Sequence, residues 1–98
     1  MKVTKTISSE DTFSDKIATP ENQLHNNFGR LLLILDGLSD STVTLQCSID
    51  GGSTWYDVKS FTSNTVEDVF LPSINSLARV GIKTGDYGSD SVDAILSK

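Results

Sequence analysis

The fold is decided by residues 42–49, which read TVTLQCSI. Val43, Leu45, Cys47 and Ile49 alternate with polar residues along this stretch. With a period of two, the apolar side chains share one face of a strand and the polar side chains share the other. The β-branched content favours the same structure. The pattern therefore predicts a strand with one buried and one polar face, on which Cys47 is a small core residue.

A turn follows this strand directly, within residues 48–55, SIDGGSTW. The Asp50 carboxylate can accept hydrogen bonds from backbone N–H groups two or three residues ahead. Gly51 and Gly52 can take the positive φ angles of a tight reversal. We expect a structural turn here, with Trp55 as an apolar plate over the end of the core. The predicted turn residues are Ser48, Asp50, Gly51, Gly52, Thr54 and Trp55.

Other segments alternate in the same way and are separated by turn residues. Together they predict an all-β fold of about eight short, mainly antiparallel strands in a sandwich or jelly-roll-like arrangement. The 98 residues are expected to form a single domain, 1–98. Residues 20–27 are expected to be a loop that can hold one helical turn. The expected strands cover residues 2–7, 12–18, 28–36, 42–49, 55–61, 65–71, 78–83 and 91–97.

The most apolar stretch of the chain carries large side chains on both faces. Leu31, Leu33 and Leu35 point to one side, and Leu32 and Ile34 point to the other. In a two-layer sandwich one face of each sheet normally meets water, so a strand that is apolar on both faces needs a second cover. We expect this cover to be another subunit, with Leu31, Leu33 and Leu35 as the candidate interface. A loop of the same chain is the alternative.

Composition excludes several classes of partner. The net charge is −5, and the eight basic residues are scattered along the chain. Because phosphate binding requires clustered Lys and Arg, no direct nucleic-acid partner is expected. The longest apolar run, residues 31–35, is too short for a membrane span, and no apolar segment follows the charged N-terminus as in a signal peptide. The single cysteine allows no intramolecular disulfide, which suits a reducing cytoplasm.

Catalysis needs converging groups, and the sequence offers few. The only histidine, His25, lies in a polar loop and cannot form a His-based zinc cluster by itself. Neighbouring carboxylates in a strand, such as Glu67 and Asp68, point to opposite faces. Residues 84–90 are expected to form a plain Gly/Asp turn rather than a calcium loop, since the full EF-hand pattern is absent. No catalytic residue, metal ligand or cofactor is therefore predicted. The other acidic candidates are Asp86, Asp90 and Asp93.

The turn resembles an Asp-box, whose pattern is S-x-D-x-G-x-T-W. The matching residues are Ser48, Asp50, Gly52, Thr54 and Trp55. In sialidase-like and other propellers such boxes are structural hairpin turns away from the catalytic centre, and this resemblance implies the same role here. A propeller needs several four-stranded blades, whereas this chain has strands for about two. A sialidase also needs an arginine cluster, and the chain has only Arg30 and Arg79.

A wider resemblance covers residues 42–96. TVTLQCSIDGGSTWYDVK at 42–59 and RVGIKTGDY at 79–87, followed by a last strand, resemble small proteins encoded among the virion genes of tailed bacteriophages. The chain departs from that pattern at Cys47, where an arginine is common, and at Leu77-Ala78, where an aromatic residue often precedes the arginine. The resemblance implies a β-sandwich or jelly-roll module that decorates capsids or forms tail and neck parts, often as a trimer.

The function that the resemblance implies is that of a non-enzymatic virion structural protein, made in the bacterial cytoplasm. It would assemble with itself, a trimer being favoured, and would dock on other virion proteins. The alternative is a carbohydrate-binding module in which Trp55, Tyr56 and Tyr87 stack on sugar rings. A small hydrolase is the third reading, and it would need a pocket with converging carboxylates.

Overall fold

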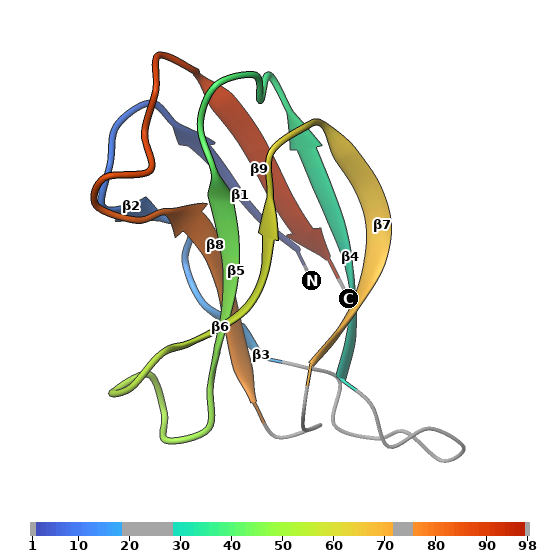
Figure 1. Cartoon of the computed structure of the whole chain (residues 1–98). Coiled ribbons are helices and arrows are strands. Elements are labelled where there is room, and N and C mark those ends of the chain that lie inside the picture. Colours follow the sequence, from blue (N-terminus) through green and yellow to red (C-terminus); the bar gives the residue numbers. More distant parts are fainter. Residues whose placement is uncertain (1, 19–28, 72–75, 98) are drawn as a thin grey trace.

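Two antiparallel sheets face each other in the structure (Figure 1). It is a computed structural model that describes residues 2–18, 29–71 and 76–97. Sheet A has the strand order β1-β9-β4-β7, and sheet B has the order β2-β8-β5-β6, with β3 also paired to β8. The strands are β1 (Lys2–Ile7), β2 (Thr12–Phe13), β3 (Ile17–Ala18), β4 (Gly29–Asp36), β5 (Val43–Ser48), β6 (Tyr56–Phe61), β7 (Thr65–Leu71), β8 (Leu77–Ile82) and β9 (Val92–Ser97).

The chain crosses repeatedly from one sheet to the other. When β2 and β3 are counted as one interrupted strand, each sheet has four strands in the order of a double Greek-key jelly roll. Every pairing in the described part of the chain is antiparallel, and that part contains no helix. The predicted all-β sandwich is therefore confirmed, whereas the loop predicted at 20–27 lies outside the described residues.

The strand predicted at 12–18 is split into two by Ser14. The backbone N–H of Ser14 donates to Val80 O over 2.8 Å, and Ser14 Oγ accepts from the Val80 N–H over 3.1 Å. A side-chain oxygen thus takes the place of a main-chain carbonyl in the ladder. The backbone can leave the sheet here because the Val80 N–H still has a hydrogen-bond acceptor. On either side of the break, β2 and β3 remain paired with β8.

The core lies between the two sheets and consists of alternate residues from nearly every strand. Leu31, Leu33 and Leu35 belong to it and are only 1%, 0% and 2% exposed. The prediction that these three leucines form an intersubunit surface is therefore corrected, because sheet B already covers them. Leu32 and Ile34 occupy the outer face of sheet A. The buried apolar residues are Ile7, Ile17, Leu31, Leu33, Leu35, Leu38, Val43, Leu45, Cys47, Phe61, Val69, Leu71, Ala78, Val80, Ile82, Val92, Ala94 and Leu96.

Strand β5 is buried on both faces, which the alternation did not predict. Its inner face supplies core residues, and Cys47 lies there as expected. On its outer face Thr44, Gln46 and Ser48 are also buried. Thr44 Oγ1 is the only buried side-chain oxygen or nitrogen among the described residues that lacks a hydrogen-bond partner. Other side chains of sheet B must therefore cover the polar face of this strand.

Gly81 allows part of that cover to approach. It pairs with Thr44 on β5 and with Phe13 on β2, so a side chain at position 81 would share the outer face with Thr44. A Cβ added to Gly81 would lie 2.5 Å from Phe13 Cδ2 and would also meet the Thr12 carbonyl oxygen. Since no side chain fits there, only glycine lets Phe13 and its backbone lie against the sheet.

We predict that Gly81→Ala lowers the free energy of unfolding by roughly 1–3 kcal/mol, because β2 must be displaced. Chemical denaturation measures this change. The control is Gly51→Ala, since a Cβ on Gly51 meets nothing within 4 Å and the positive φ of 80° is the only obstacle. That variant should lose about 1 kcal/mol. A smaller loss for Gly81→Ala than for Gly51→Ala would contradict the close approach of Phe13.

Candidate functional site

Two side chains close the turn between β5 and β6. Ser48 Oγ donates to Asp50 Oδ1 over 2.8 Å and accepts from the Gly52 N–H over 2.9 Å. Asp50 Oδ1 also accepts from the backbone N–H groups of Ser53 and Thr54, at 3.1 and 2.9 Å. These bonds, led by that from the Thr54 amide and then by that from Ser48, lower the pKa of Asp50 to about 2. The Asp50 carboxylate is therefore ionised at neutral pH, and in that form it holds the turn together through these hydrogen bonds.

The backbone of this turn requires its two glycines. The φ angle is 80° at Gly51 and 100° at Gly52, in the region that other L-residues rarely adopt. All six residues predicted for the turn thus lie in this connection or at its edge. Ile49 differs from expectation, because β5 ends at Ser48 and the Ile49 side chain is 67% exposed instead of buried.

Trp55 does not cover the end of the core, contrary to the prediction. Its indole Nε1 donates to the Gly52 carbonyl oxygen over 3.0 Å, which folds the ring back onto the turn. The ring also lies against Arg79, whose Cζ is 4.3 Å from the ring centroid. Trp55 is therefore part of the layer on the outer face of sheet B.

Arg79 lies between two aromatic rings on that face. Its Cζ is 4.1 Å from the Phe13 ring centroid as well as 4.3 Å from that of Trp55. Two rings cannot occupy the same side of one guanidinium plane at such distances, so one ring lies on each side. Each contact of this kind contributes about 0.5–2 kcal/mol. Burial lowers the pKa of Arg79, with nearby Asp11 acting in the opposite direction, but an arginine remains protonated at neutral pH.

A row of hydrogen bonds joins Arg79 to the neighbouring strands. Arg79 Nε donates to Gln46 Oε1 over 2.9 Å, and Gln46 Nε2 donates to Asp57 Oδ1 over 2.9 Å. Lys83 Nζ then donates to Asp57 Oδ2 over 2.7 Å. The hydrogen bond from Lys83, followed by that from Gln46, lowers the pKa of Asp57. The hydrogen bond between Lys83 and Asp57 also raises the pKa of Lys83. We call the set Phe13, Gln46, Trp55, Asp57, Arg79 and Lys83 the Arg79 cluster.

A β-bulge in β6 completes this row. Leu45 pairs with Lys59, but Gln46 pairs with Asp57, so Val58 is an extra residue in the β5–β6 ladder. Without the bulge, Asp57 would share the inner side with Lys59, two residues away. With it, Asp57 lies on the outer face, where Gln46 and Lys83 reach it. The sequence carries no signal for this bulge, which is why the Arg79 cluster was not predicted.

Asp90 and Asp40 hold two loops together at the opposite end of the sandwich. Asp90 Oδ2 accepts from the backbone N–H groups of Ser39, Asp40 and Ser41, at 2.8, 2.9 and 3.0 Å. Asp90 Oδ1 accepts from Ser39 Oγ over 2.6 Å. Asp40 in turn accepts from the backbone N–H and the hydroxyl of Ser89. The hydrogen bond from the Ser39 hydroxyl, and next the one from the Ser39 amide, lower the pKa of Asp90 well below the usual range of an aspartate.

The acidic residues that the sequence offers for calcium binding or hydrolysis do not come together in the structure. Asp90 is committed to the loop amides, and Asp93 accepts from Thr6 Oγ1 on a neighbouring strand. Glu67 forms an ion pair with Lys59 at 2.9 Å, and the register places Asp68 on the other face. Within residues 2–18, 29–71 and 76–97, no three His, Cys, Asp or Glu side chains gather as metal ligands. His25 lies outside those ranges.

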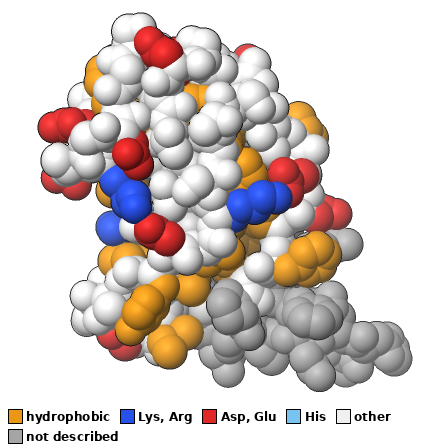
Figure 2. All heavy atoms as spheres, in the orientation of Figure 1, with side chains coloured by type: hydrophobic (Ala, Val, Ile, Leu, Met, Phe, Trp, Pro, Cys, Tyr) orange, Lys and Arg blue, Asp and Glu red, His pale blue; other side chains and the backbone are white. Residues whose placement is uncertain are grey.

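A cleft of about 360 Å³ opens between the edge strands β6 and β7. Apolar side chains form part of its wall, and Lys59 and Glu67, which line it, pair with each other. On the side of the molecule shown in Figure 2, hydrophobic atoms reach the surface between acidic and basic ones. The cleft has the volume of a small ligand site but brings no reactive group together. Its lining residues are Leu45, Val58, Lys59, Glu67, Asp68, Val69 and Phe70.

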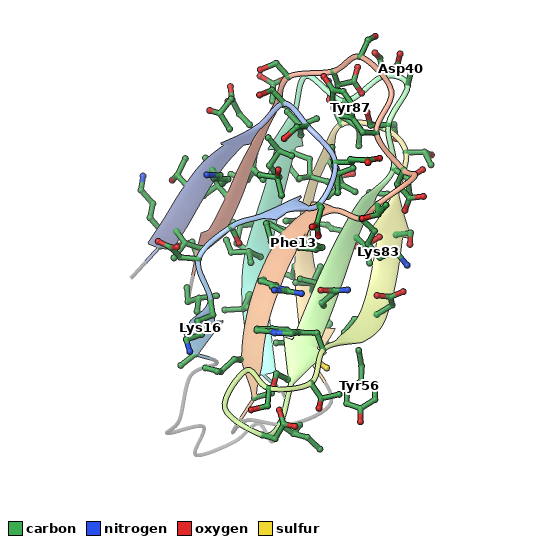
Figure 3. The ribbon with its side chains drawn as sticks, turned by 90° about the vertical axis from the view of Figure 1, so that its left-hand side faces the viewer. Phe13, Lys16, Asp40, Tyr56, Lys83 and Tyr87 are labelled. Atoms are coloured by element: carbon green, nitrogen blue, oxygen red, sulfur yellow. The ribbon has the colours of Figure 1, made fainter. Side chains whose placement is uncertain are left out.

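The aromatic residues considered for sugar binding do not form one platform. Tyr56 is exposed beside the turn, whereas Tyr87 lies at the opposite end of the sandwich and packs against the core (Figure 3). One face of the Trp55 ring is occupied by Arg79. No observation therefore favours the carbohydrate-binding alternative over the others.

Comparison with known proteins identifies no relative. The chain matches no protein-family model, no curated protein and no solved structure. In the described part of the chain no helix is long and apolar enough to cross a membrane.

We predict that acid destabilises the protein as the pH falls from about 4 to about 2. Asp50 and Asp90 have lowered folded-state pKa values, whereas an unfolded Asp titrates near 3.9. Their stabilisation is complete above the unfolded value and is lost as the pH falls toward the folded values. Thermal melts between pH 7 and pH 2 measure this loss.

Asp50→Asn and Asp90→Asn should each lower the melting temperature at pH 7 and make it depend less on pH in this window. Asp15→Asn removes the same charge from an exposed side chain in the break between β2 and β3 and serves as the control. Variants of Asp50 and Asp90 that keep the wild-type acid transition would refute this role of the two carboxylates.

Proposed function

We propose that this protein is a non-enzymatic structural component of a tailed-bacteriophage virion, which assembles with its own copies and docks on the particle. The resemblance of residues 42–59 and 79–87 to virion proteins supports a place in the virion. The jelly-roll strand order is also one that viral capsid domains use. The observation that carries the proposal is an aliphatic surface on the outer face of sheet A.

This surface follows from the register of three strands. Ile34 on β4 pairs with Val66 on β7 and with Ile95 on β9, which sets three aliphatic side chains in one row. Leu32 lies on the same face two residues from Ile34. Val66 is 72% exposed and Leu32 is 37% exposed. Sheet B covers the inner face of β4, so the side chains of β4 that still need an apolar partner are Leu32 and Ile34 on the outer face.

A second copy of the chain is the occupant that we propose for this surface. Burial of apolar area supplies about 25 cal/mol per Å², which favours a cover for aliphatic side chains. The acidic net charge of −5 keeps separate copies soluble until such a surface is matched. A closed ring of copies, with a trimer favoured by the resemblance, would bury the row in each subunit.

We predict a homo-oligomer, most simply a trimer, in size-exclusion chromatography with light scattering. Val66→Glu should convert it to a monomer, because the charge would have to be buried between subunits. Ile49→Glu is the matched control, since Ile49 is also an exposed aliphatic residue but lies in the β5–β6 turn. A wild-type monomer at tens of micromolar would rule out self-assembly through this face.

We further predict that the protein is present in purified particles of the phage that encodes it. Quantitative mass spectrometry of density-banded virions should recover its peptides at many copies per particle, and antibodies against the folded domain should label the particle surface. Capsid and tail peptides in the same sample are the internal control. Their recovery without any peptide of this chain would contradict the proposal.

A further inference from the structure

We infer that the Arg79 cluster is a recognition site for a carboxylate, presented by an acidic segment of a partner protein. The inference concerns sheet B, the opposite side of the sandwich from the aliphatic row. It does not depend on the proposed virion function, because the same chemistry would serve any partner with an exposed Asp or Glu.

The first step is that the Arg79 guanidinium is fixed before any ligand arrives. Phe13 and Trp55 hold its two faces, and Gln46 Oε1 accepts its Nε–H. Gln46 is fixed in turn through Asp57. A free arginine side chain loses up to about 2 kcal/mol of rotamer entropy when it is immobilised, and here the fold has already imposed that cost. Preorganisation of this kind raises affinity.

The second step is that the donating edge of this guanidinium remains open. Nε is its only atom with a hydrogen-bond acceptor among the described residues, and neither terminal nitrogen is a buried unpaired atom. The terminal N–H groups can therefore donate to a planar group with two acceptor oxygens. A carboxylate has that geometry, and its bidentate pair with arginine is among the stronger charge-assisted contacts.

The third step concerns the charges around Arg79. Lys83 belongs to the same face, and Lys16 Nζ lies 3.5 Å from the position of a Cβ on Gly52, beside Trp55 (Figure 3). Asp57 forms an ion pair with Lys83, whereas Arg79 and Lys16 form none with a described residue. Asp11 acts on Arg79 without a direct ion pair, so a carboxylate ligand has to compete with it. These two cations favour one or two carboxylates. A nucleic-acid backbone would require a larger basic surface than a chain of net charge −5 provides here.

A protein suits this face better than a sugar. Arg79 occupies one face of both the Phe13 and the Trp55 ring, so the two rings offer no shared open platform for a pyranose. Ile49, in the β5–β6 turn that Trp55 folds back onto, is 67% exposed. Aromatic and arginine side chains at the centre with apolar neighbours are typical of protein interfaces.

Fluorescence titration of the isolated chain tests the inference, because Trp55 is its only tryptophan. A short oligoglutamate peptide should change the emission saturably, and oligoglutamine of the same length should not. Arg79→Lys keeps the charge but loses the bidentate fork, so we expect roughly tenfold weaker binding. Lys5→Gln removes an exposed positive charge from β1 of sheet A and should bind as the wild type does.

A second readout uses the wild-type chain and does not depend on how a variant folds. In ¹⁵N-edited spectra the Nε–H resonance of Arg79 should move during the titration, while that of Arg30, the only other arginine, should stay in place. An unmoved Arg79 resonance, or equal movement of both arginines, would overturn the inference. Binding of an oligogalacturonate but not of oligoglutamate would also overturn it, since the carboxylate would then belong to a glycan.

Discussion

The double burial of strand β5 is the constraint on which the rest of the structure depends. Its inner face contributes Val43, Leu45 and Cys47 to the core, while its outer face carries Thr44, Gln46 and Ser48, which are equally inaccessible. Burying polar side chains costs free energy unless they are hydrogen-bonded. Gln46 bonds to both neighbouring strands and Ser48 closes the turn, whereas Thr44 Oγ1 remains without a partner. The side-chain layer over sheet B is thus as much a part of the folding problem as the core is.

Much of the fold could be predicted from the sequence, because period-2 alternation and turn chemistry are local signals. The bounds of β1 and β7 agree with the predicted 2–7 and 65–71, and the other long strands differ by one residue at one or both ends. The turn at 48–55 was recognisable since its serine, aspartate and glycines each meet a local stereochemical requirement. Strand β4 was correctly seen as apolar on both faces. The choice of its inward face was wrong, because sequence alone does not show which side the second sheet covers.

The Arg79 cluster could not be predicted, because it depends on three features that are not local. The Val58 bulge turns Asp57 to the outer face, Gly81 admits Phe13 against the sheet, and Ser14 attaches the interrupted strand to β8. Each involves residues from strands that are distant in sequence. Trp55 illustrates the consequence. Its size and position after the turn suggested a cap on the core, but the partner that fixes its place is Arg79, 24 positions further along the chain.

The two sheets consequently present surfaces of different chemistry. The outer face of sheet A carries an aliphatic row, whereas sheet B presents a fixed arginine between aromatic rings. Apolar area gives affinity with little orientation, and a bidentate ionic contact gives orientation and selectivity. A domain that uses the first face for its own copies keeps the second free for a different partner.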